Sequence, residues 1–260
     1  MQSKKKPCPR LYRAVRWLVK VIYPKTTVSG IENLPDEPVI IVGNHTQLHG
    51  PIVSELYLPF PRRIWCAGQM MSLSEVPGYA FSDFWSQKPR YLHPFFRLLS
   101  YIIAPLSVLI FNNAHTIAVH RDARILSTFK ETVACLKNGE SIVIFPEHDV
   151  KYNNIVYEFQ ENFIDVARLY HKRTGKEVLF VPMYVAPKLK SVYLGKPVRF
   201  NANNDIADER KKLCRQLADA ITDIAVNLPP HTVVPYRNIP KKLYPKNRLP
   251  EAPCNEETSC

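Results

Sequence analysis

The sequence lacks the cysteine pairs of a zinc site or of a disulfide framework. Its six cysteines are scattered and include no C-x-x-C pair: Cys8, Cys66, Cys135, Cys214, Cys254 and Cys260. We therefore expect free thiols in a reducing compartment. The 260 residues also contain no low-complexity block and no internal repeat, and this length suits one sizeable α/β core.

A long apolar run is also missing. The segment LLSYIIAPLSVLIF (98–111) has fourteen uncharged residues and contains Pro105, whereas a membrane-spanning helix needs about 20. We expect this segment to be either a buried core helix or a monotopic insertion, with no clear transmembrane helix in the chain. Basic residues interrupt the apolar positions near the N-terminus, so no secretory signal peptide is expected either.

Acidic residues are few compared with basic ones. Lys and Arg number 35 against 23 Asp and Glu, which gives a formal charge of +12. Such a surface suits a phosphate-rich partner, either nucleic acid or an anionic membrane. The chain has no zinc-finger, helix-turn-helix or RNA-binding signature, and many basic residues lie in the terminal segments. We therefore expect an anionic membrane surface as partner, and no nucleic acid.

The N-terminal segment 1–24 predicts a basic amphipathic helix. Within RLYRAVRWLVKVIYP (10–24), basic residues recur every three or four positions and share one helical face, beside an aromatic and aliphatic one. A helix of this kind suits the headgroup region of a membrane. The alternative is an ordinary amphipathic helix that packs on the domain. Together with the apolar segment, it predicts a peripheral or monotopic protein on the cytoplasmic face of a membrane.

Residues 25–228 alternate between predicted strands and helices. Strands are expected at 38–43, 63–68, 115–121 and 178–185, a strand that runs into a loop over 141–149, and a hairpin over 192–200. This order predicts a single α/β domain with a mostly parallel central sheet flanked by helices. The proline-rich tail, 229–260, is expected to be extended and partly disordered beyond about Tyr244.

Four short motifs follow these strands, where α/β folds carry their chemistry. They are Asn44-His45, HTIAVHR (115–121), Phe145-Pro146-Glu147 and Val181-Pro182. In this order and spacing the chain resembles the glycerophospholipid acyltransferases, of which lysophosphatidic acid acyltransferase is the type. The motifs match N-H-x-x-x-x-D, G-x-I-x-V-x-R, F-P-E-G-T-R-S and V-P over roughly residues 25–200.

The resemblance implies a reaction and a role for each motif. His45 would be the general base that activates an acceptor hydroxyl, a task that suits the free pKa of imidazole. Asn44 would contribute to substrate binding, Arg121 would bind the acceptor's phosphate, and Glu147 would hold the acceptor or organise the loop. The acyl donor would be acyl-CoA or acyl-carrier protein, and the acceptor a lysophospholipid, by default 1-acyl-glycerol-3-phosphate. No cofactor or metal is expected.

Each of these residues also has a simpler interpretation from the sequence alone. His45 could be a loop histidine with local hydrogen bonds, Arg121 a surface arginine or the ion-pair partner of Asp122, and Glu147 a solvated turn carboxylate. A separate hypothesis for the whole protein, nucleic-acid binding, rests only on the formal charge of +12.

Two departures from the family motifs bear on the mechanism. Gly50 stands where the family has the aspartate that orients the histidine, and Val150 stands where it has an arginine, with Lys151 next to it. One hypothesis is that Asp149 or Glu147 has taken over the orienting role. The other is a degenerate relative that binds membrane lipid without acyl transfer.

Overall fold

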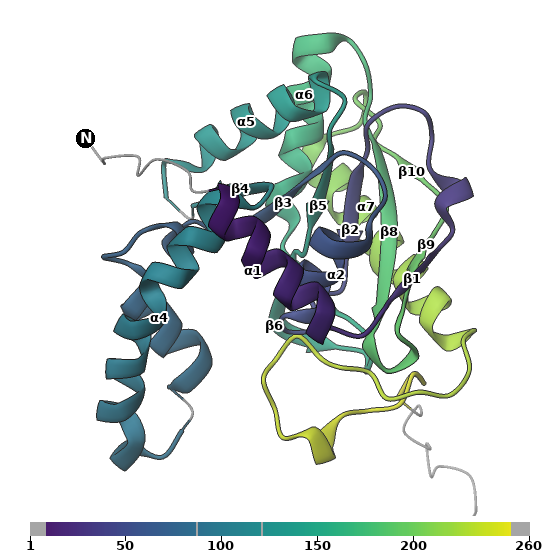
Figure 1. Ribbon diagram of the computed structural model, residues 1–260. Helices are drawn as coiled ribbons and strands as arrows, with labels where there is room; N and C mark the ends of the chain where they lie inside the picture. Colours follow the sequence, from purple (N-terminus) through teal and green to yellow (C-terminus); the bar gives the residue numbers. More distant parts are fainter. Residues whose placement is uncertain (1–8, 87, 121, 251–260) are drawn as a thin grey trace, which may run out of the picture.

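The computed structural model describes residues 9–86, 88–120 and 122–250, and an eight-stranded sheet forms its centre (Figure 1). The sheet has the order β1-β9-β8-β2-β5-β3-β4, with β10 also paired to β8, while β6 and β7 form a separate pair. The strands are β1 (Thr27–Ser29), β2 (Ile40–Gly43), β3 (Arg62–Ala67), β4 (Thr116–Val119), β5 (Ser141–Ile144), β6 (Glu147–Tyr152), β7 (Tyr157–Phe159), β8 (Leu179–Ala186), β9 (Ser191–Leu194) and β10 (Val198–Arg199). The α-helices are α1 (Pro9–Ile22), α2 (His49–Tyr57), α3 (Val76–Ala80), α4 (His93–Asn113), α5 (Ile125–Lys137), α6 (Asp165–Thr174) and α7 (Ile206–Val226).

The centre of the sheet is parallel and buried on both faces. β2 pairs in parallel with β5 and β8, and β3 with β5 and β4, whereas β9 and β10 are antiparallel to β8. In β2, Ile40 and Val42 belong to the cluster covered by α5, α6 and α7, while Ile41 faces the opposite cluster with Val53 of α2. Unbroken β-branched runs suit such doubly covered strands. The predicted single α/β domain with a mostly parallel sheet and flanking helices is confirmed.

Two predictions of local structure are wrong. Residues 192–200 form no hairpin, because β9 and β10 both pair with β8 along the same side of that strand. The segment after β5 is also more than a loop, because β6 and β7 form an antiparallel ribbon that turns at Asn153 and Asn154. Asn154 has φ 72°, and asparagine is one of the few residues that tolerates this left-handed conformation.

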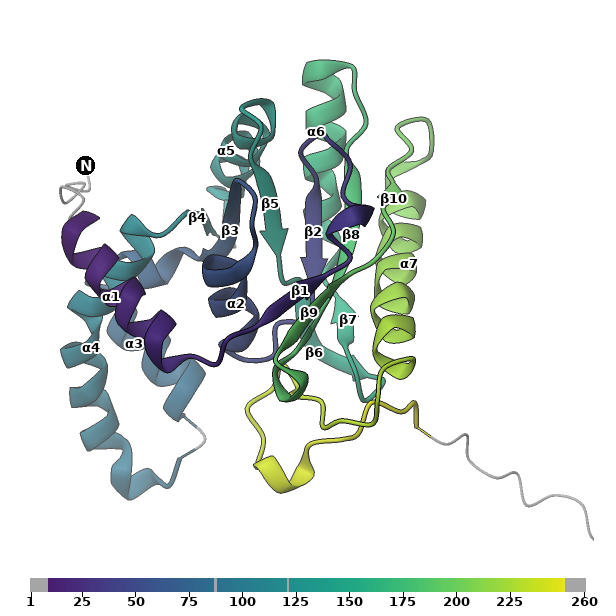
Figure 2. The ribbon, with the colours of Figure 1, turned by 45° about the vertical axis from the view of Figure 1, so that its right-hand side comes forward.

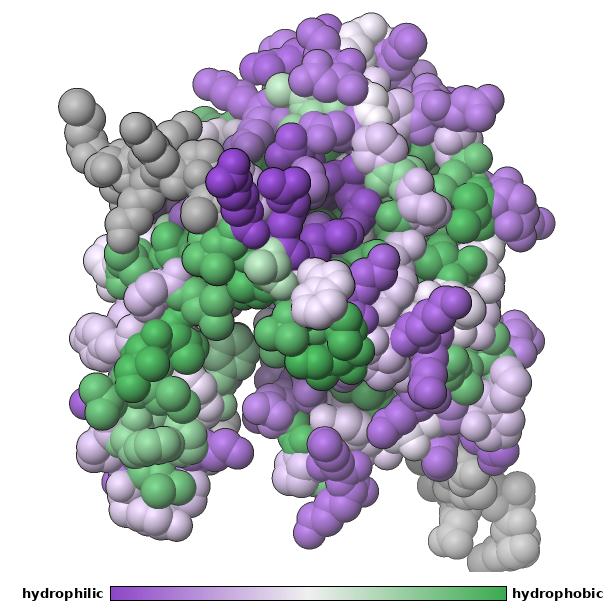
Figure 3. Space-filling model, in the orientation of Figure 1, coloured by the Kyte–Doolittle hydropathy of each residue, from purple (hydrophilic) through white to green (hydrophobic). Residues whose placement is uncertain are grey.

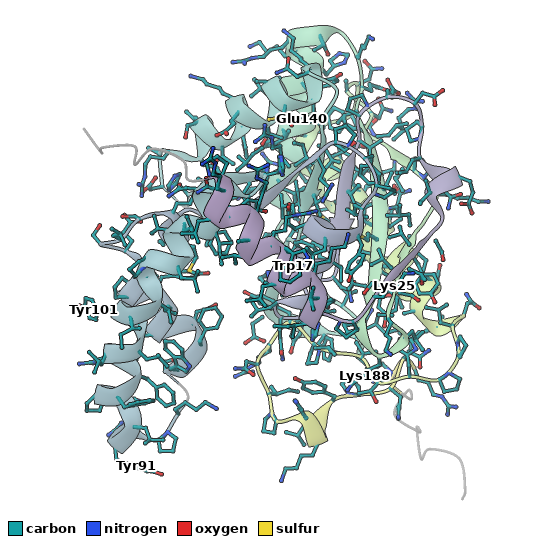
Figure 4. The ribbon with its side chains drawn as sticks, viewed as in Figure 1. Trp17, Lys25, Tyr91, Tyr101, Glu140 and Lys188 are labelled. Carbon is teal, nitrogen blue, oxygen red and sulfur yellow. The ribbon has the colours of Figure 1, made fainter. Side chains whose placement is uncertain are left out.

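Helix α4 continues through Pro105 and presents apolar side chains to the surface (Figures 3 and 4). It spans His93–Asn113, and only its inner face, which includes Ser100 and Ala104, is buried. Tyr101 is 68% exposed and points outward in Figure 4, and Figure 3 shows hydrophobic residues over much of the helix. Of the two alternatives for residues 98–111, the buried core helix is therefore wrong, and the monotopic insertion stays a prediction. By length and composition alone, Arg90–Asn113 is the one helix of the described chain that could cross a membrane.

Helix α1 attaches to the domain through its polar side. Tyr12 is its buried residue, and the Tyr12 hydroxyl donates to Glu55 Oε1 of α2 at 2.8 Å. Arg16 Nε donates to the same oxygen at 3.0 Å. The opposite face is open, with Trp17 66% exposed. Helix α1 thus does not pack on the domain through its apolar face, contrary to the ordinary amphipathic alternative.

The C-terminal strap, defined here as residues 229–250, packs against the domain. Asn247 is 3% exposed, and its side-chain amide donates to Ala225 O at 2.8 Å. The Asn247 Oδ1 accepts from the backbone N of His231 at 2.8 Å, and the His231 ring contacts the Tyr184 hydroxyl at 2.8 Å. Residues 245–250 of the predicted tail are thus held by the domain, and partial disorder of the tail stays a prediction. The remaining ten residues of the predicted tail lie outside the described residues.

Candidate functional site

The candidate site lies at the carboxyl ends of β2 and β5, which are adjacent strands. His45 lies two residues after the end of β2, and Phe145 directly follows the end of β5. The loop after His45 turns sharply, because Thr46 and Gln47 have φ values of 46° and 56°. Left-handed conformations are costly for a β-branched residue and persist where the surroundings enforce them, which is common at functional sites.

Asn44 ties this loop to the neighbouring strand. Its Nδ2 donates to Val185 O at 3.1 Å, and its Oδ1 accepts from Val185 N at 2.7 Å. The side chain is 1% exposed. Both polar atoms of the Asn44 side chain thus bind the backbone of β8, and these bonds hold the loop in place. Its role in substrate binding stays a prediction.

Glu147 is the buried carboxylate of the site. It is 3% exposed, and Oε1 accepts from the backbone N of His45 at 2.6 Å while Oε2 accepts from the backbone N of Tyr157 at 2.7 Å. Burial raises the pKa of Glu147 to about 7, and the two N–H donors oppose that shift. The carboxylate therefore joins the His45 loop to the β6–β7 ribbon.

The imidazole of His45 lies between two aromatic rings. The ring centroids of Phe145 and Tyr236 are 5.3 Å and 5.4 Å from that of His45, both in edge-on arrangements. Burial lowers the pKa of His45 to about 4, and the backbone of Gln47 opposes this only in part. Its Nδ1 is buried and, among the described residues, has no hydrogen-bond partner. The ring is thus neutral at pH 7, and neither Glu147 nor another described carboxylate orients it.

Neither Asp149 nor Lys151 forms a hydrogen bond or an ion pair with His45 among the described residues. The Asp149 Oδ2 pairs with Arg237 Nε of the C-terminal strap at 3.3 Å, so this carboxylate is engaged elsewhere. Lys151 is exposed on β6. Arg121 lies outside the described residues. The roles of these three residues stay predictions.

The backbone around Gly50 leaves no room for the aspartate of the family motif. The Gly50 N–H donates to His45 O at 3.1 Å. A Cβ at position 50 would lie 2.7 Å from that same oxygen and 2.8 Å from Phe145 Cε1. A Cβ this close to another heavy atom would force one of them to move. One of the two atoms, His45 O, belongs to the backbone and cannot rotate away as a side chain can. Glycine is therefore required by the close approach of helix α2 to the His45 loop.

The strap contributes two residues that the sequence did not indicate. Tyr236 packs on His45 and on Tyr157, with ring centroids 6.2 Å apart in the second contact, and Arg237 pairs with Asp149. No motif marks either residue, and a proline-rich segment carries no periodic signal that could place it against the sheet. The described residues contain no group of three or more His, Cys, Asp or Glu side chains placed to hold a metal ion.

The chain has distant structural neighbours among solved proteins. No protein-family model matches the chain, and no curated protein matches it. The chain is similar in structure to the 1-acyl-sn-glycerophosphate (LPA) acyltransferase PlsC from Thermotoga maritima, with 14% identity and a TM-score of 0.48. The match covers 84% of this chain and 81% of that one. A structural likeness at this level of identity bears on the fold alone.

Proposed function

We propose that the protein is a membrane-associated acyltransferase. It moves a fatty acyl group from acyl-CoA or acyl-carrier protein to a lysophospholipid, by default 1-acyl-glycerol-3-phosphate, as a step of phospholipid biosynthesis. The observation that carries the proposal is His45, a neutral imidazole held at the carboxyl end of a central strand by a buried carboxylate on its backbone amide.

The chemistry requires one base and no cofactor. An acceptor hydroxyl gives its proton to the unprotonated imidazole of His45 as its oxygen attacks the thioester carbonyl. The carbon–sulfur bond then breaks, and the imidazolium returns the proton to the leaving thiolate. A base with a pKa near 4 is weak, so the bound acceptor has to raise that pKa. A phosphate near the ring does this by favouring the charged form.

Two surface helices support the assignment of a membrane partner. Helix α1 presents Trp17 and Ile22 away from its polar attachment at Glu55, and α4 presents Tyr101 and Leu98. Figure 3 shows hydrophobic residues over both helices on one face. Exposed apolar area of this extent is rare on a protein that meets only water. With basic residues along α1, the surface suits the boundary between headgroups and acyl chains on the cytoplasmic side.

A second function, lipid binding without acyl transfer, is favoured by one observation. The His45 ring has no orienting carboxylate among the described residues, and its Nδ1 is unpartnered. In enzymes that orient a histidine with an aspartate, loss of the orienting group costs a factor on the order of 10⁴ in rate. A protein of this second kind would bind vesicles and produce no acyl transfer with any donor.

The deciding experiment is an acyl-transfer assay of the purified protein on anionic vesicles. Acyl-CoA and acyl-carrier protein serve as donors against a panel of lysolipids, with His45→Ala as the blank. His49→Ala is the matched control, because His49 lies four residues later and contacts the Tyr23 hydroxyl at 2.6 Å, outside the proposed chemistry. We expect product with the wild type and with His49→Ala only. Vesicle binding without product from any donor would establish the second function instead.

A further inference from the structure

The C-terminal strap is the most basic segment near the candidate site. Residues 229–250 contain no Asp or Glu and five Lys or Arg residues: Arg237, Lys241, Lys242, Lys246 and Arg248. Figure 2 shows the strap below the carboxyl ends of β2 and β5, at the edge of the sheet that carries His45. A positively charged segment therefore borders the place where a reacting group would sit.

Two contacts fix the strap against the His45 loop, and a third fixes it to β6. The Tyr236 ring lies 5.4 Å from that of His45, and Gln47 Nε2 donates to the Tyr244 hydroxyl at 2.8 Å. Between these two points, Arg237 Nε pairs with Asp149 Oδ2 at 3.3 Å. Asp149 lies on β6 two residues after Glu147, whose carboxylate binds the His45 amide, so Arg237 pairs with the same strand that holds the His45 loop.

The pair of Arg237 and Asp149 remains open to solvent. Their side chains are 57% and 45% exposed, and Arg237 makes no other ion pair within the described residues. A guanidinium offers five N–H donors in a planar fork that matches a phosphate, and an exposed single-nitrogen contact uses few of them. Asp149 thus holds the arginine in position without burying it.

We propose that Arg237 binds the phosphate monoester of the lipid acceptor at the His45 site. It supplies from the strap the charge that Val150 on β6 does not. The inference rests on the proposed function, because it takes His45 as the base of the reaction. A phosphate held by Arg237 places negative charge beside the imidazole, which is the sign needed to raise the pKa of His45.

Equilibrium binding tests the inference without turnover. Titration calorimetry compares 1-acyl-glycerol 3-phosphate with monoacylglycerol, which lacks the phosphate, each in neutral-detergent micelles. Inorganic phosphate is the third ligand, and it separates a lipid headgroup from a free anion. The variants are Arg237→Ala, Arg237→Lys and the matched control Lys241→Ala, a basic residue of the same strap.

We expect Arg237→Ala to weaken binding of the phosphate-bearing lipid by about tenfold or more. Monoacylglycerol binding is expected to stay within about twofold, and Arg237→Lys is expected to restore part of the loss, because it keeps the charge without the fork. Lys241→Ala is expected to resemble the wild type. Inorganic phosphate is expected to bind more weakly than the lipid and to depend on Arg237 as well.

Several results would overturn the inference. These are an equal loss for both lipids, an equal effect of Lys241→Ala, no preference of the wild type for the phosphate-bearing lipid, or inorganic phosphate bound as tightly as the lipid. Failure of the proposed function is a separate result: Arg237-dependent binding with no acyl transfer removes the enzyme and leaves the phosphate site. Acyl transfer with unchanged phosphate discrimination in Arg237→Ala removes the phosphate site alone.

Discussion

Glu147 binds the backbone amide of His45 at 2.6 Å and leaves the imidazole without a carboxylate partner. Glu147 therefore fixes the backbone of the His45 loop. Its second oxygen holds Tyr157 N, so one buried group fixes two backbone segments at the site. Glu147 thus holds the loop in place but does not orient the His45 ring.

Replacement of Glu147 by glutamine is expected to destabilise the protein. The glutamine amide has one acceptor oxygen, so its NH₂ group would face one of two backbone N–H donors, His45 N or Tyr157 N. A buried donor left without an acceptor costs about 1–3 kcal/mol. Urea denaturation measures the loss, and amide hydrogen exchange at His45 and Tyr157 locates it. Glu158→Gln, at an exposed position of β7, is the control; equal midpoints for both variants would contradict the account.

The ring of His45 is expected to titrate well below the usual range of histidine. Burial lowers its pKa to about 4 from 6.5, so between these values the unfolded chain binds the extra proton and the folded state does not. Stability from this residue is therefore present above pH 6.5 and lost as pH falls toward 4. NMR titration of the His45 ring in wild type and Asp149→Asn measures this directly. A midpoint near 6.5, or a shift caused by Asp149→Asn, would show that the ring is exposed or paired with that carboxylate.

Glu147 shifts stability in the opposite direction over a similar range. Its pKa of about 7 lies above the ordinary value of 4.5, so between these values the folded protein retains a proton there that the unfolded chain has lost. Stability from Glu147 is fully present below pH 4.5 and declines as pH rises through 7. A pH series of urea midpoints for Glu147→Gln is expected to lack this decline. The same decline in wild type and variant would contradict the raised pKa.

Restoring the family aspartate at position 50 is expected to damage the protein. Any side chain there meets His45 O at 2.7 Å, so Gly50→Ala and Gly50→Asp both require the backbone to move, at a cost of about 1–3 kcal/mol. Gly78→Ala is the matched control, because Gly78 also lies in a helix and a Cβ there contacts nothing within 4 Å. Thermal unfolding compares the three variants. A Gly50→Asp protein as stable as the wild type, with faster acyl transfer, would contradict this account of the loop.

The parallel core was predictable because its strands are continuous apolar runs. Residues 39–43 and 141–144 are buried, and strands covered on both faces are typically near-continuous apolar runs rich in β-branched residues. The β6–β7 ribbon was missed because β6 is mostly polar and β7 has only three residues, although Asn153-Asn154 is a turn signal that could have suggested it. The 192–200 hairpin was wrong because sequence shows where a chain turns and not which neighbour it pairs with.

The site was predictable in position and not in geometry. His45 and Glu147 were placed at adjacent strand ends by their motifs, and the structure brings them together. Which atom of His45 the carboxylate binds depends on a few ångströms of loop geometry. The contacts of Tyr236 and Arg237 depend on Asn247, which anchors the strap through buried hydrogen bonds that no pattern announces.

Charge placed on the open face of α1 is expected to weaken membrane binding. Trp17→Glu puts a carboxylate where we propose that the acyl chains lie, and Leu126→Glu is the matched control, an exposed apolar residue of α5. Co-sedimentation with anionic vesicles is expected to fall about tenfold or more for Trp17→Glu, since a charged side chain replaces a large apolar one. An equal fall for Leu126→Glu, or none for Trp17→Glu, would place the membrane contact elsewhere.

The most direct test of the account is the single-turnover rate of acyl transfer on anionic vesicles for wild type, His45→Ala and His49→Ala. If His45 is the base, His45→Ala lowers the rate by about 10²–10⁴-fold, the usual contribution of general base catalysis. His49→Ala is expected to stay within about threefold of the wild type, and urea denaturation checks that both variants are folded under the assay conditions. Equal rates for wild type and His45→Ala would contradict the central claim.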